Sequence, residues 1–212
     1  MNVALTGPKD LRTRHTQWRP SHRLVPTRFP PIGLFDRVAD PKDLDAVYAL
    51  ESVTNDRLRE EAGDLALVPA ADRIAGPGTA PIMAAFTHLN PDGSRFSDGA
   101  YGVYYCGQAL ATALAEVRYH QERFLRRTHE GPLRLELRLY LSDLDAKLVD
   151  VRKQAAYHDP DDYLPGQRLG RTLRRGGGYR LQRALHRLPI VLSDQRRPRM
   201  FGQRLRGVRM RD

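Results

Sequence analysis

The chain has 212 residues, of which 41% are hydrophobic and 28% are charged. This length favours one domain, or one domain with a poorly ordered end, and the composition excludes a mainly disordered, fibrous or membranous protein. No stretch approaches the roughly 18 consecutive apolar residues that a membrane helix requires, and the first thirty residues lack the apolar segment of a secretory signal. The single cysteine, Cys106, excludes an internal disulfide and a cysteine-based zinc site. We therefore expect a protein of the reducing cytoplasm without a membrane partner.

The net charge of +10 is concentrated at one end of the chain. Residues 171–212 contain thirteen arginines, no lysine and two aspartates, which gives this segment a charge of +11 and leaves −1 for residues 1–170. The body of the chain is therefore nearly neutral. Any direct binding of nucleic acid would depend on the basic segment.

The first half of the chain has weak structural signals. Residues 1–36 are polar, contain three prolines close to their end and follow no sustained period, which predicts an extended arm. Residues 42–62 place apolar side chains near helical spacing and predict one or two helices. Gly76-Pro77-Gly78 and Pro81 predict a break in the chain, and Asn90-Pro91-Asp92-Gly93 predicts a turn.

The second half of the chain is more regular. Residues 100–106 are aromatic and β-branched between glycines, which predicts a buried strand. Residues 108–127 repeat apolar side chains every three or four positions, as an amphipathic helix does, and leucines alternate with polar residues within the strand predicted over 133–151. A further helix is predicted over 167–175, before three consecutive glycines. This order predicts an α+β domain in which helices pack on a small mixed or antiparallel sheet.

The common catalytic motifs are absent from the sequence. There is no phosphate-binding Walker loop, no nucleophile elbow, no zinc-protease motif and no dinucleotide-binding glycine pattern after a strand. The seven histidines have no ligand spacing, so we expect no metal. The candidate polar residues that remain lie around the clearest strand and helix, and are Arg37, Arg95, Tyr101, Tyr105 and Glu116.

Several of these residues belong to a recognisable pattern. The run Arg95–Tyr105, followed by Ala109, Ala113 and Glu116, resembles the core of RES-domain proteins, the toxins of bacterial RES–Xre toxin–antitoxin pairs. The resemblance covers roughly residues 33–175. Its further parts are Leu34-Phe35-Asp36-Arg37-Val38, Asp159-Pro160-Asp161-Asp162-Tyr163 and Gln167-Arg168-Leu169-Gly170.

The resemblance implies both a domain division and an activity. A catalytic domain over residues 37–175 would lie between the arm, 1–36, and an arginine-rich segment, 176–212. Its fold would be related to that of ADP-ribosyltransferase toxins, and its substrate would be NAD⁺. The enzyme would cleave the nicotinamide–ribose bond by hydrolysis, phosphorolysis or ADP-ribosyl transfer. The implied partners are an Xre-family antitoxin and, in a homo-oligomer, further copies of the chain.

The residue types suit the roles that the family implies. Cleavage of an N-glycosidic bond builds positive charge on the ribose, which the carboxylate of Glu116 would stabilise. The planar forks of Arg37 and Arg95 would bind the pyrophosphate. The ring of Tyr105 would stack on nicotinamide, and Tyr101 belongs to the same candidate NAD⁺-binding set. The implied catalytic residues are Glu116, Tyr105 and Arg37.

Each of these residues also has a plainer interpretation. Glu116 on an amphipathic helix is equally a solvated charge or a partner of His120, one turn further on. Tyr105 is by default a core side chain, and a lone arginine such as Arg37 is by default on the surface. Cys106 is best explained as a small buried hydrophobe.

The resemblance is expected to end near residue 176. The family has a serine in a strand after the 164–175 helix, but the chain continues Gly178-Tyr179-Arg180-Leu181 and nothing there aligns. A shifted reading frame or a diverged lineage would explain both this loss and the arginine-rich composition. Two alternatives to an active toxin follow: a basic protein that binds nucleic acid through this segment, and an inactive RES member.

Overall fold

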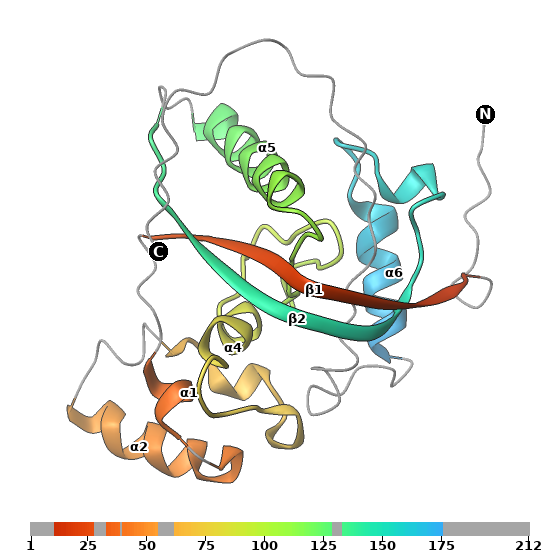
Figure 1. Ribbon diagram of the computed structural model, residues 1–212. Coiled ribbons are helices and arrows are strands. Elements are labelled where there is room, and N and C mark those ends of the chain that lie inside the picture. Colours follow the sequence, from red (N-terminus) through yellow and green to blue (C-terminus); the bar gives the residue numbers. More distant parts are fainter. Residues whose placement is uncertain (1–10, 28–32, 39, 55–61, 129–132, 176–212) are drawn as a thin grey trace. The chain divides into compact units, whose positions relative to one another are not determined.

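The computed structural model describes residues 11–27, 33–38, 40–54, 62–128 and 133–175 (Figure 1). These residues form helices and a two-stranded antiparallel sheet, so the predicted α+β class is confirmed. The predictions for residues 176–212, including the replaced serine strand, lie outside the described residues. No helix of the described ranges is long and apolar enough to cross a membrane.

The part of the chain that the structure describes divides into two compact units. Its residues within 11–16, 33–104 and 145–175 belong to the first unit, and its residues within 17–27 and 105–144 belong to the second.

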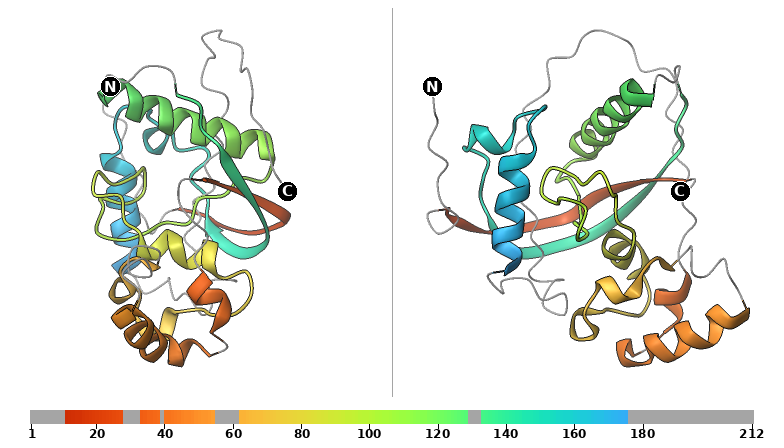
Figure 2. Two further views of the ribbon diagram at one scale, coloured as in Figure 1. Left: turned by 90° about the vertical axis from the view of Figure 1, so that its left-hand side faces the viewer. Right: turned by 180° about the vertical axis from the view of Figure 1, so that it is seen from behind.

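The sheet is a ribbon of two strands, β1 (Thr13–Pro26) and β2 (Leu137–Val149), which Figure 2 shows from two further sides. The Asp150 N–H donates to the Arg12 carbonyl at one end, and the Thr27 N–H donates to the Glu136 carbonyl at the other, over 2.8 and 2.9 Å. β2 confirms the strand predicted from alternating leucines. β1 lies within the arm predicted over 1–36, so that prediction was wrong for these residues. The strand was missed because its buried side chains follow no period of two and its partner strand is distant in the sequence.

Three short helices of the first unit pack around buried apolar side chains. They are α1 (Gly33–Arg37), α2 (Leu44–Thr54) and α4 (Ala80–Thr87). The Asp36 carboxylate accepts a hydrogen bond from the Ala80 N–H, 3.0 Å away, so α1 caps the start of α4. Phe35 and Met83 are fully buried. α2 confirms a helix within 42–62, whereas α4 was missed because Pro81 suggested a break, although proline is tolerated in a helix's first turn.

Single 3₁₀ turns connect the helices of the first unit. They are η1 (Pro41–Asp43), η2 (Leu65–Leu67), η3 (Ala70–Asp72) and η4 (Ala155–Tyr157). The last helix, α6 (Leu164–Arg175), confirms the prediction over 167–175 and begins three residues earlier. The Asp162 carboxylate accepts a hydrogen bond from the Leu164 N–H and so helps to set the point where α6 begins.

The strand predicted over residues 100–106 is not formed, and this prediction was wrong. A Cβ at Gly102 would lie 2.0 Å from the Ala85 carbonyl oxygen, so the segment lies directly against the backbone of α4 rather than beside another strand. Its aromatic residues are nevertheless packed, and Tyr104 is buried. The predicted burial therefore holds for Tyr104, whereas Tyr101 and Tyr105 are partly exposed, and the predicted strand pairing was wrong.

The second unit contains the longest helix among the described residues, α5 (Leu110–Thr128), which confirms the amphipathic helix predicted over 108–127. An isolated antiparallel bridge joins His22 to Gly107 just before this helix, with two backbone hydrogen bonds of 2.8 Å. A Cβ at Gly107 would lie 3.0 Å from the Ala113 nitrogen, so the chain passes close to the first turns of α5.

Candidate functional site

In the first unit, the segment Ser94–Tyr101 lies on a glycine face of α6. A Cβ at Gly166 would lie 2.3 Å from the Arg95 carbonyl oxygen, and one at Gly170 would lie 2.1 Å from that of Phe96. The two glycines are four residues apart and therefore share one side of the helix. Backbone thus meets backbone, and this fixes the distance between the segment and α6.

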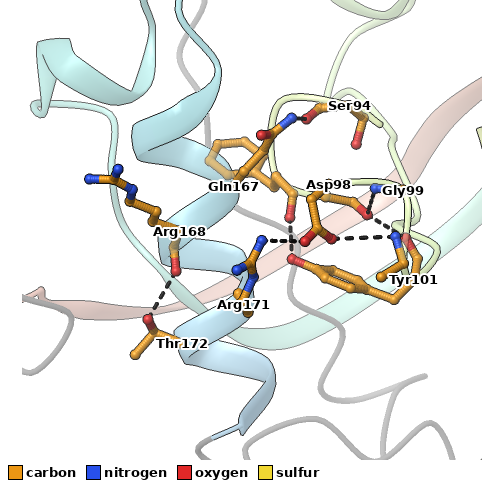
Figure 3. Close-up of polar contacts among 11 residues, drawn as sticks. Ser94, Asp98, Gly99, Tyr101, Gln167, Arg168, Arg171 and Thr172 are labelled. Carbon is orange, nitrogen blue, oxygen red and sulfur yellow. Dashed lines mark hydrogen bonds and ion pairs between the residues drawn. The ribbon is translucent and has the colours of Figure 1, made fainter. Parts of the chain in front are cut away.

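Polar contacts hold the same segment to α6 (Figure 3). The Gln167 side-chain amide donates to the Ser94 carbonyl over 3.1 Å. Arg171 forms an ion pair with Asp98. The Tyr101 hydroxyl donates to the Phe96 carbonyl over 2.6 Å and closes the turn. Two stretches that carry the family resemblance, one around Arg95 and the other around Gln167, are therefore in direct contact.

Arg95 is buried inside this arrangement, with 2% of its surface exposed. One terminal nitrogen donates to the carbonyls of Tyr157 and Asp159, over 3.4 and 2.7 Å. The guanidinium carbon lies 4.6 Å from the centre of the Tyr163 ring, a cation–π contact. Its Nε is buried and has no hydrogen-bond partner among the described residues. Arg95 therefore ties its own segment to the loop before α6.

Tyr101 lies on the solvent side of the same segment and is partly exposed. Burial, reinforced by the neighbouring Asp98 carboxylate, raises the pKa of Tyr101 to about 12 against the opposing effect of Arg174 and Arg171. The phenol therefore stays protonated at neutral pH and acts as a hydrogen-bond donor. Burial by itself would raise the pKa of Asp98. The hydrogen bond from the Ala100 N–H and the charge of Arg171 outweigh this effect and hold the pKa of Asp98 below its ordinary value.

Arg37 lies elsewhere in the first unit, as the last residue of α1. Its side chain is exposed, and Nε donates to the Gly33 carbonyl of the same helix over 3.2 Å. This is a surface position, as expected for a lone arginine.

Tyr105 and Glu116 belong to the second unit, at the junction that leads into α5. The Arg23 guanidinium donates to the Tyr105 carbonyl over 3.1 Å. Glu116 is half-buried, and its carboxylate oxygen lies 3.6 Å from His120 Nε2, which is the contact that the plainer interpretation predicted. Glu116 also acts electrostatically on the Cys106 thiol, which follows Tyr105 in the chain.

Cys106 adjoins this junction, but it has the properties of a packed thiol and not of a nucleophile. Burial raises the pKa of Cys106 to about 11, and Glu116 adds to this effect, while a hydrogen bond with Ser21 and the charge of Arg23 partly oppose it. At neutral pH the group is therefore the protonated thiol. The protonated thiol agrees with the hydrophobic role expected for Cys106, although the residue is partly exposed and not fully buried as predicted.

The raised pKa predicts slow alkylation of Cys106 in the folded chain. At pH 8 the thiolate fraction should be on the order of 10⁻³ for the native thiol and about one quarter for an unfolded one with a pKa near 8.5. Iodoacetamide should therefore label the native protein roughly 200-fold more slowly than the protein in guanidinium chloride, and the native rate should rise tenfold per pH unit toward pH 10. Intact mass gives the rate directly because the chain has one cysteine. Equal labelling of native and unfolded protein would contradict a buried, protonated thiol.

Several polar residues of these two clusters were not among the sequence candidates. Asp98, Gln167 and Arg171 lie within or beside the stretches that resemble the family, so those stretches gave a signal for them. Arg23 had none, because it lies in β1, which the sequence did not predict. Within the described residues, no group of three histidine, cysteine or acidic side chains is arranged to hold a metal ion.

Comparison with known proteins decides the family. The sequence matches the RES domain over residues 70–195, more than half of the chain. The chain belongs to the RES-domain family. The match includes Arg95, Tyr101, Tyr105 and Glu116 but not Arg37, and it continues beyond residue 176, where the resemblance was expected to end.

The chain is also similar to a curated protein. It is the uncharacterized protein y4oC of Sinorhizobium fredii (strain NBRC 101917 / NGR234), 34% identical over 134 residues. The aligned part covers 62% of the chain and 56% of the relative, so the chain spans about half the length of this protein. No solved structure matches the chain. RES domains are associated with toxins of toxin–antitoxin systems that use NAD⁺.

Proposed function

We propose that this chain is an NAD⁺-consuming enzyme that cleaves the bond between nicotinamide and ribose, and that it is the toxin of a toxin–antitoxin pair. The observation that carries the proposal is the RES-domain match, which includes four of the five candidate residues. The partner that we propose is an Xre-like antitoxin, and the site of action is the cytoplasm. The homo-oligomer and the relation to ADP-ribosyltransferase toxins belong to the same proposal.

Glu116 has the central role in the proposed reaction. As the glycosidic bond breaks, its electron pair leaves with nicotinamide, and positive charge develops on the ribose ring. A half-buried carboxylate stabilises that charge more than an exposed one does, because less water screens it. Water, phosphate or a protein side chain then forms the new bond to the ribose carbon.

Tyr105 and the arginines serve to bind and orient the dinucleotide. The Tyr105 ring offers a flat face for nicotinamide, and its backbone is held by Arg23. Arg37 presents an exposed guanidinium that suits a phosphate. Because Arg95 is buried, we propose that it acts on the site mainly by shaping the segment that leads to Tyr101.

The direct test is to incubate the purified full chain with NAD⁺ and identify the products by mass. We expect free nicotinamide in every productive reaction. ADP-ribose would identify hydrolysis, a phosphorylated ADP-ribose formed only with added phosphate would identify phosphorolysis, and an ADP-ribosylated protein formed in a cell extract would identify transfer. NAD⁺ that stays intact with all three acceptors would contradict the proposed function.

A further inference from the structure

A pocket of about 540 Å³ opens on the first unit beside the segment that carries Tyr101. It is lined by Asp98, Ala100, Tyr101, Arg171, Arg174 and Arg175. The lining contains three arginines and one aspartate, so it has a net positive charge. The three arginines belong to α6, whose glycine face holds the segment on which the other lining residues lie.

The three arginines differ in the contacts that their side chains make within the protein. Arg171 is paired with Asp98, so its charge is largely neutralised. The Arg174 guanidinium carbon lies 5.0 Å from the centre of the Tyr101 ring, which restrains this side chain at the pocket without neutralising it. Within the described residues, neither Arg174 nor Arg175 forms an ion pair. Two positive charges on one turn of a helix are thus left for an anion.

The volume of the pocket and the chemistry of its arginines indicate which kind of anion it would bind. The volume falls within the range of about 300–1,000 Å³ that is typical of small-molecule pockets, and exceeds what a single phosphate would fill. Arginine forks bind phosphate oxygens bidentately. A diphosphate presents several such oxygens and a charge that two free guanidinium groups can balance.

We propose that this pocket binds the diphosphate group of a nucleotide, with Arg174 and Arg175 as its phosphate ligands and Tyr101 as the side chain that positions Arg174. The inference concerns binding alone and does not depend on cleavage of NAD⁺. The same chemistry is present in ADP, in ADP-ribose and in NAD⁺ itself.

The test is calorimetric titration of the full-length protein with ADP, ADP-ribose, adenosine and inorganic pyrophosphate. We expect ADP and ADP-ribose to bind at least tenfold more tightly than adenosine. Arg174→Ala should weaken ADP binding about tenfold, the scale of one charge-assisted hydrogen bond. Arg168→Ala is the matched control, because Arg168 is an exposed arginine of the same helix that does not line the pocket, and Figure 3 shows it directed away from Arg171 and Asp98.

A second variant tests the same site by strengthening it. Asp98→Asn removes the one carboxylate of the lining and should tighten ADP binding severalfold, a result that a misfolded protein would not give. Binding of pyrophosphate as tight as that of ADP would place all recognition in the phosphates, and binding of ADP-ribose alone would identify the product of the proposed reaction as the ligand. Either result supports the pocket when Arg174→Ala weakens that binding, and places the ligand elsewhere when Arg174→Ala leaves it unchanged.

Three results would overturn the inference. They are no binding of any diphosphate, equal losses from Arg174→Ala and Arg168→Ala, and binding of a single-stranded oligonucleotide without binding of ADP. The second would indicate a diffuse attraction by the net charge of the chain, and the third would identify a nucleic-acid surface. Measured NAD⁺ cleavage is independent of all three, so failure of the pocket and failure of the proposed enzyme are distinguishable.

Discussion

Replacing Glu116 by glutamine should reduce NAD⁺ cleavage about 100-fold or more, the scale observed when one electrostatic group is removed from a transition state. Glutamine keeps the size of the side chain and loses the charge that stabilises the ribose cation. The measurement is nicotinamide release at saturating NAD⁺. Substrate binding should change much less than turnover, because the positive charge arises only as the bond breaks.

Glu122→Gln is the matched control for this variant. Glu122 lies on the same helix, is more exposed than Glu116 and pairs with Arg118 over 2.6 Å. Loss of such a surface pair costs at most about 1 kcal/mol, so both variants should unfold close to the unchanged protein. Equal activity of Glu116→Gln and Glu122→Gln would remove Glu116 from the mechanism and leave its contact with His120 as its role.

Gly170→Ala should destabilise the chain by about 2–4 kcal/mol, more than the roughly 1 kcal/mol that a helix gains from this exchange. The new Cβ would lie 2.1 Å from the Phe96 carbonyl oxygen and 2.6 Å from the Tyr101 hydroxyl oxygen. The new Cβ would meet a main-chain oxygen, which cannot move aside as the end of a flexible side chain can. The segment and α6 must therefore separate, and the hydrogen bond from the Tyr101 hydroxyl to the Phe96 carbonyl must lengthen or break. Denaturant unfolding of the full chain measures the loss.

Gly33→Ala is the matched control at another helical glycine, and we expect it not to lower the free energy of unfolding. Its Cβ would meet only Arg37 Nε at 3.8 Å, an ordinary contact, so this change should be neutral or stabilising by up to about 1 kcal/mol. If both variants unfold like the unchanged protein, then the close approach of α6 to its neighbouring segment is wrong.

Local pattern predicted the elements in which apolar residues recur at a regular spacing. The helix α5 and the strand β2 have regular apolar periods, and the structure contains both. β1 was missed because its pairing depends on a distant partner, and its own side chains alternate poorly. The segment 100–106 has the composition of a strand, but Gly102 brings it against a helix, where no ladder of hydrogen bonds can form.

The candidate site was predictable to a similar degree. The sequence resemblance to the family located the stretches around Arg95 and Gln167, and in the structure these stretches are in direct contact. Resemblance could not indicate that Arg95 is buried, because burial depends on the carbonyls of Tyr157 and Asp159, which are distant in sequence. The basic pocket of α6 was also beyond prediction, since Asp98 and Arg174 meet only in the folded chain.

The glycine face of α6 bears on how remote homologues should be compared. Main-chain atoms determine the spacing there, so the flanking side chains can drift during evolution without altering the geometry, provided that the positions of Gly166 and Gly170 stay small. A search for distant members of the lineage should therefore give these two positions as much weight as any charged residue.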